Sequence, residues 1–238
     1  MKKLSLVVAF IGFSSMAYCT ELESFFKVTD VFFKRYVSNS RVDYIGIKKA
    51  SSDIENLVKL VGTMNLEEAS VLSKKAFYVN AYNLIVIYAV IKNYPIKSPL
   101  DVSGFFDKAT YRVAGEELTL NKLETEKLLR TYLDSRFHFV LVCAAKSCPP
   151  LANFAYTPDT IEQQLTERTK LAVNDSNWLR INPSKGIVGL SKIFDWYSSD
   201  FKSNGNIELG WINQYRNEKI PNSYKIEFYE YDWSLNEK

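Results

Sequence analysis

Apolar side chains recur at helical spacing in several long segments of the chain. Residues 21–37 place them on one face, which predicts an amphipathic helix. Residues 76–91 are apolar on every side except at Asn80 and Asn83. A helix that is hydrophobic all round lies inside a protein, so we expect this segment at the centre of the fold.

Further helices are predicted where a polar capping residue precedes apolar positions at helical spacing. Asn65, with Glu68 three residues later, predicts the N-terminus of the central helix. Thr119, Thr157 and Ser191 each precede a similar run, so we expect a helix to begin at each of them. Helices therefore occupy much of the chain.

Strands are predicted in shorter stretches. The most strand-like segment is Phe137–Val142, which combines β-branched and aromatic residues. Strand pairs are expected around Gly115 and around Asn182-Pro183, with a closing strand over residues 224–231. Several connections are too short for parallel crossovers. The sequence predicts an α+β fold, with a small mixed or antiparallel sheet packed with helices.

The N-terminus has the pattern of a secretory signal peptide over residues 1–19. Lys2-Lys3 forms a cationic start, Leu4–Phe13 is apolar, and Ser15-Met16-Ala17 offers small residues for cleavage. The apolar run is too short for a finished membrane-spanning helix. We expect removal of this segment to leave a single α+β domain over residues 20–238.

Export predicts a periplasmic or secreted protein of the bacterial envelope. Lipid attachment at Cys19 would instead give a membrane-anchored lipoprotein, but Tyr18 is bulky where that signal requires a small residue. Without residues 1–19 the net charge falls from +3 to +1, because two lysines and no acids are lost. Such a near-neutral chain lacks the basic surface of nucleic-acid-binding proteins, so we expect no nucleic-acid partner.

Reactive side chains are concentrated in the segment Arg136–Pro150. It contains the chain's one histidine, His138, and two of its three cysteines, Cys143 and Cys148. A thiolate beside an imidazole is the arrangement used by cysteine-dependent hydrolases and transferases. One hypothesis therefore makes Cys143 a nucleophile, His138 its base and Glu124 the carboxylate that orients the imidazole. The substrate would be an amide or ester in a small molecule or peptide.

The alternative is a non-catalytic envelope module that binds a small molecule or glycan, or is structural. In a continuous strand, His138 and Cys143 would lie roughly 16 Å apart on opposite faces. In an oxidising compartment, Cys143 and Cys148 are close enough in sequence to form a disulfide. Glu124 and Asp200 would then be solvated surface charges, and the tryptophans would be core or sheet cover.

The two asparagines of the central helix require partners, because a buried unpaired amide costs about 1–3 kcal/mol. We favour the interpretation that Asn80 and Asn83 hold adjacent loop backbone. Alternatively, they rim a ligand pocket with Glu124, Arg136 and His138. The Cys-x4-Cys pair, with a histidine five residues upstream, lacks the usual spacing of a zinc site. We therefore expect no metal and no other cofactor.

Several segments, taken in order, resemble the family catalogued as domain of unknown function 547. They are Val42-Asp43-Tyr44, Ala76–Asn83, Tyr94–Ser98, Arg136–Pro150, Tyr156-Thr157-Pro158, Leu190–Tyr197 with Asp200-Phe201, and Tyr231–Asn236. The resemblance covers most of the chain after residue 19. Two departures are that Tyr78 stands where the family usually has tryptophan, and that residues 123–130 are one residue longer than usual. The resemblance implies no settled activity.

Overall fold

The computed structural model describes residues 9–202 and 208–238, with side chains from residue 21 onward. Residues 1–8 of the expected signal peptide lie outside this range. Its remaining residues belong to the first helix, α1 (Ala9–Tyr36). Among the described residues, no helix combines the length and apolar character needed to cross a membrane.

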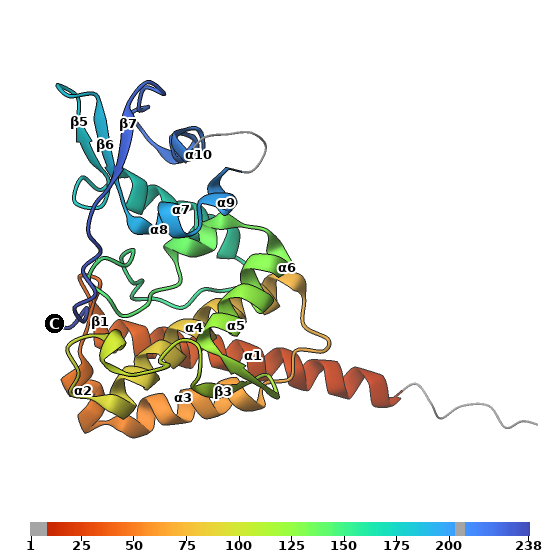
Figure 1. The fold of residues 1–238 in the computed structure, drawn as a ribbon. Coiled ribbons are helices and arrows are strands. Elements are labelled where there is room, and N and C mark those ends of the chain that lie inside the picture. Colours follow the sequence, from red (N-terminus) through yellow and green to blue (C-terminus); the bar gives the residue numbers. More distant parts are fainter. Residues whose placement is uncertain (1–8, 203–207) are drawn as a thin grey trace, which may run out of the picture.

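A helical layer forms the lower half of the molecule in Figure 1. The long helix α4 (Val71–Asn93) packs against α3 (Ser51–Thr63) and the short α2 (Tyr44–Lys49), and α1 contacts α3. Most side chains of α4 from Ala76 to Ile91 are buried, which confirms the prediction of a central helix.

The start of α4 differs from the expected one. Its N-cap is Ser70, whose Oγ accepts a hydrogen bond from Ser73 N at 3.1 Å. Asn65 instead accepts a hydrogen bond from Glu67 N at 2.8 Å. Asparagine stabilises this local turn by the same side-chain chemistry with which it caps helices, so the sequence signal could not separate the two.

The strands form three small sheets. Strands β1 (Val37–Ser38) and β2 (Arg41–Val42) pair antiparallel, as do β3 (Thr110–Val113) and β4 (Glu116–Thr119). The third sheet lies at the top of Figure 1, where β6 pairs antiparallel with β5 and parallel with β7. Its strands are β5 (Arg180–Asn182), β6 (Ile187–Leu190) and β7 (Lys225–Phe228). The α+β fold class is confirmed.

The predicted strand Phe137–Val142 is wrong. Residues Ser135–Phe139 form a 3-10 helix, η3, and the chain then continues without regular structure. The amides of Val140 and Leu141 donate to Phe137 O at 3.0 and 3.1 Å, so these groups close a turn rather than a sheet. The β-branched and aromatic residues are there because the segment is buried, which is also why it resembled a strand.

The segment after β4 is one distorted helix. Thr119 caps α5 (Leu120–Lys122), as predicted, and the chain continues into the π-helix η2 (Leu123–Leu129) and α6 (Arg130–Tyr132). A π-turn holds one more residue than an α-turn.

The remaining helices lie between this layer and the third sheet in Figure 1, with α10 beside that sheet. They are α7 (Ile161–Asn174), α8 (Lys192–Trp196), α9 (Ser198–Phe201) and α10 (Glu208–Tyr215). Ser191 caps α8, as predicted. Thr157 does not cap α7, which begins at Ile161; its backbone amide instead donates to Gln164 Oε1 at 3.2 Å.

The segment η3 connects two hydrophobic clusters. Phe137 and Val140 are buried in the larger cluster around α4. Phe139 belongs to an aromatic cluster under the third sheet, where its ring stacks on Trp211 at 5.5 Å. Because neighbouring side chains enter different clusters, η3 is held on both sides, and His138 lies between these anchored residues.

Candidate functional site

A pocket of about 400 Å³ is lined by residues of η2, η3, α8 and the C-terminal segment. Glu124, His138 and Cys143 all line it. These are the three residues that the sequence analysis grouped as a catalytic set. The extended strand for which that separation was expected is absent, because η3 and the irregular chain after it replace it.

The imidazole of His138 is oriented by a carboxylate from α9. His138 Nε2 lies 2.8 Å from Asp200 Oδ2, and the ring packs against Tyr197 with centroids 4.2 Å apart. The hydrogen bond with His138 lowers the pKa of Asp200. If Nε2 carries the hydrogen, Nδ1 is the basic nitrogen of the ring. Asp200 is 35% exposed, so it combines the expected surface position with a hydrogen bond to His138.

Glu124 is buried, which corrects its alternative interpretation as a solvated side chain. Its carboxylate accepts a hydrogen bond from the Tyr197 hydroxyl at 3.1 Å. Burial raises the pKa of Glu124, against the opposing effects of His138 and of hydrogen bonds from Tyr197 and Tyr82. Glu124 therefore sits in the pocket as predicted, but the hydrogen-bonding partner of His138 is Asp200.

The two cysteines of the segment are joined as a disulfide, with Cα atoms 6.3 Å apart. Cys143 is half-buried and lines the pocket, whereas Cys148 is buried. The Tyr231 hydroxyl lies 3.2 Å from Cys143 Sγ and donates to Cys148 Sγ at 3.3 Å. Cys143 thus lines the pocket beside the Tyr231 hydroxyl, and in the disulfide state it has no thiol.

The asparagines of α4 position the backbone around the site. Asn83 Nδ2 donates to Val140 O at 2.8 Å, and its Oδ1 accepts from Val142 N at 3.0 Å. Asn80 makes the same pair of bonds to Tyr156, at 2.8 and 3.0 Å. Both amides are satisfied by backbone and neither lines this pocket. Asn83 holds the segment that leads directly into Cys143.

Arg136 lies outside the pocket, in an ionic cluster between η3 and α7. Its guanidinium contacts Asp134 at 2.6 Å and Glu162 at 2.5 Å, and Lys75 of α4 contacts Glu162 at 2.5 Å. These contacts join η3 to its neighbouring helices. The structure therefore places the expected binding residue Arg136 in a structural role.

Aromatic side chains form one wall of the pocket. Trp196 stacks on Trp233 with centroids 5.8 Å apart, and Tyr231 lies 5.0 Å from Trp196 and 4.8 Å from Trp233. Trp196 is 49% exposed. The expectation that these tryptophans are core or sheet cover is wrong for Trp196, whereas Trp211 is buried in the aromatic cluster.

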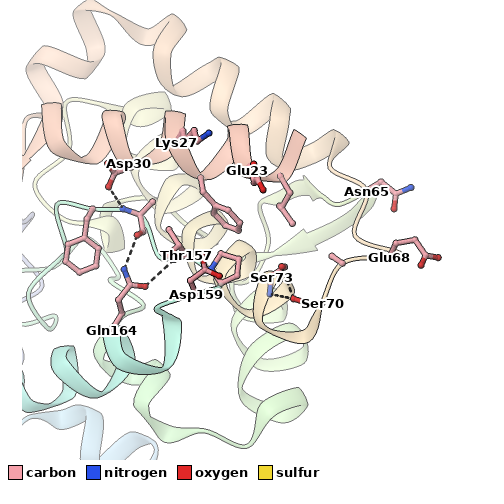
Figure 2. Close-up of a pocket in the computed structure, with 16 residues that line it drawn as sticks. Glu23, Lys27, Asp30, Asn65, Glu68, Ser70, Ser73, Thr157, Asp159 and Gln164 are labelled. Carbon is pink, nitrogen blue, oxygen red and sulfur yellow. Dashed lines mark hydrogen bonds between the residues drawn. The ribbon is translucent and has the colours of Figure 1, made fainter. Parts of the chain in front are cut away.

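A larger cavity of about 910 Å³ lies between α1, the start of α4 and the loop before α7, as Figure 2 shows. Several of its polar side chains hold the fold together. Asp30 Oδ1 accepts from Ala155 N at 3.1 Å, and Gln164 Oε1 accepts from Thr157 N at 3.2 Å. None of the seven predicted site residues lines it, so we place the functional site in the smaller pocket.

In the part of the chain that the structure describes, no three His, Cys, Asp or Glu residues are grouped so that they could hold a metal ion.

Residues 66–171 match the family model described as "Protein of unknown function, DUF547". The chain resembles the DUF547 family. The DUF547 segment contains all seven predicted site residues, whereas Asp200 and the aromatic wall lie beyond it. No curated protein and no solved structure matches the chain. The DUF547 description assigns no activity, so the function has to be argued from the pocket.

Proposed function

We propose that this protein is a cysteine-dependent hydrolase or transferase that acts on an amide or ester. One observation carries the proposal: Cys143, His138 and Glu124 line the same pocket, and Asp200 orients His138. A sulfur, a base and a carboxylate that holds the base are the parts of a nucleophilic site. They come from chain segments far apart in the sequence.

The reaction begins with reduction of the disulfide. A dithiol reductant supplies two electrons and two protons, which frees the thiols of Cys143 and Cys148, and is itself oxidised to a disulfide. His138 then removes the proton of the Cys143 thiol, and the thiolate attacks the carbonyl carbon of the substrate. The leaving amine or alcohol takes the proton from the imidazolium, which gives a thioester on Cys143. Water or another acceptor removes the acyl group.

Neighbouring groups stabilise the charges that develop on His138 and Cys143 during the reaction. Asp200 orients the imidazole of His138 and stabilises its cationic form. The hydroxyl of Tyr231, already in contact with both sulfurs, donates to the Cys143 thiolate after reduction. Burial raises the pKa of Glu124, and its carboxyl group lines the pocket in which a substrate would lie.

Cys148→Ser provides the direct test, because it leaves Cys143 unable to form the disulfide. This variant should cleave a small activated ester without reductant, whereas the wild type should require dithiothreitol. Cys143→Ser should be inactive under both conditions. His138→Gln in the Cys148→Ser background should lose about 10²-fold or more in rate, the usual contribution of a general base. An inactive Cys148→Ser variant that remains folded would overturn the proposal.

The closed disulfide favours a second candidate, a non-catalytic binding module of the cell envelope. Export to an oxidising compartment would keep Cys143 and Cys148 paired, and the exposed ring of Trp196 could stack on a sugar or another planar ligand. On this alternative, replacement of Cys143 by serine leaves ligand affinity unchanged, and no variant cleaves an ester. Measurements on the same Cys148→Ser and Cys143→Ser variants therefore distinguish the two candidate functions.

A further inference from the structure

The pocket proposed above is lined by acidic rather than basic groups. Asp107 is exposed at its edge and Glu124 is buried within it. No lysine or arginine is found among the described residues that line this pocket. A ligand carboxylate or phosphate would therefore meet like charge at Asp107 without a fixed cation to offset it.

The aromatic wall offers ring faces to a cation. Trp196, Tyr231 and Trp233 contact one another along one side of the pocket, and Trp196 is 49% exposed. An ammonium group over a tryptophan face is attracted by the ring quadrupole, by about 0.5–1 kcal/mol at an exposed site. A neutral alkyl group of the same shape gains only the apolar contact.

The protein does not supply this cation itself. Among the side chains of residues 21–202 and 208–238, no lysine or arginine lies over the ring of Trp196, Tyr231 or Trp233. Lys192, on the same helix as Trp196, has its ammonium 3.1 Å from Asp195 and lies over Phe228. The wall of the pocket is thus available to a positively charged group of a ligand.

We infer that the ligand of this pocket is a cationic amide or ester, whose ammonium group lies against the aromatic wall near Asp107. The inference rests on the proposed function for the location of the site, and it adds the charge of the substrate. The acyl carbon would then lie toward Cys143 and His138, deeper among the lining residues.

Binding to a catalytically inactive protein tests this inference without requiring turnover. The full chain carrying Cys143→Ser would be titrated calorimetrically with three esters of similar size. They are 2-(trimethylammonio)ethyl acetate, its uncharged carbon isostere 3,3-dimethylbutyl acetate, and the anion 3-acetoxypropanoate. We expect the cation to bind at least about threefold more tightly than the isostere, and the anion most weakly.

Two exposed positions allow variants that leave the core intact. Asp107→Asn and Trp196→Ala, each added to Cys143→Ser, should reduce the preference for the cation over its isostere to about twofold or less. Glu117→Gln, which neutralises an exposed acid on the β3–β4 hairpin, is the matched control and should leave the preference unchanged. High salt should weaken the Asp107 contribution more than that of Trp196.

The outcomes separate this inference from the proposed enzyme. Equal binding of the cation and its isostere, or tighter binding of the anion, overturns the inference. If both Asp107→Asn and Trp196→Ala still prefer the cation over its isostere, the inference is also overturned, because other residues then recognise the positive charge of the ligand. If the cation is preferred but Cys148→Ser cleaves no ester, the pocket binds cations and only the catalytic proposal fails.

Discussion

Asn83→Ala should destabilise the protein strongly, although it removes only three heavy atoms from one side chain. The amide of Asn83 bonds the carbonyl of Val140 and the amide of Val142, and all three residues are buried. No neighbouring strand offers these backbone groups an alternative partner, because the segment is irregular. Loss of the side chain therefore leaves one buried acceptor and one buried donor unpaired.

The magnitude follows from those two groups. An unpaired buried polar group costs about 1–3 kcal/mol, so the pair sets a range of about 2–6 kcal/mol. Entry of water into the vacated space would recover part of this cost. We expect the free energy of unfolding to fall by about 3 kcal/mol.

Urea denaturation followed by tryptophan fluorescence measures this loss. The matched control is Asn93→Ala, at the exposed end of the same helix, where the amide bonds only Ala89 O at 2.8 Å. It should change the free energy of unfolding by no more than about 0.5 kcal/mol. Hydrogen exchange at the Val142 amide should accelerate in Asn83→Ala and not in the control. If both variants lose equally little stability, Asn83 does not hold this segment, and the reasoning is refuted.

Three further predictions concern charge and redox state. Reduction should lower the free energy of unfolding by about 2 kcal/mol, as judged by denaturation with and without dithiothreitol, and the double variant Cys143→Ser with Cys148→Ser should show no such dependence. Burial raises the pKa of Glu124 above its ordinary value of 4.5. The contribution of this group to the free energy of unfolding is therefore complete below pH 4.5 and is lost as the pH rises through the folded-state pKa. Glu124→Gln should therefore gain stability relative to the wild type as the pH rises above 4.5, and a constant difference would contradict the burial argument. The pKa of Asp200 is lowered by its bond with His138, so its contribution is present above the ordinary value of 3.8 and is lost as the pH falls. As the pH falls below 3.8, the free energy of unfolding should decrease less in Asp200→Asn than in the wild type. An equal decrease in both proteins would exclude this contribution.

Local patterns in the sequence identified the parts of the fold that local physics determines. The all-apolar segment with two asparagines is the buried helix α4, and both amides bond to backbone, as favoured. Thr119 and Ser191 cap helices because a side-chain oxygen reaches amides two or three residues away. These features depend only on neighbouring residues, so a single sequence contains them.

The rest depended on contacts between distant residues. Phe137–Val142 has strand-forming residues, but its backbone bonds go to its own turn and to Asn83. Asp200 lies 62 residues after His138, and no spacing rule connects them. Glu124 was expected in the site, yet its burial against Tyr197 was not visible in a helix that also carries lysines. Tertiary packing decides each of these cases.

The account depends on whether His138 and Asp200 activate the sulfur of Cys143. The rate of Cys143 alkylation by iodoacetamide should be measured against pH in Cys148→Ser, alone and combined with His138→Gln or Asp200→Asn. We predict that the thiol of the single variant titrates well below about 8.5, the pKa of a free cysteine, and that it moves toward this value when either partner is replaced. A thiol that titrates near 8.5 in all three proteins would contradict the account.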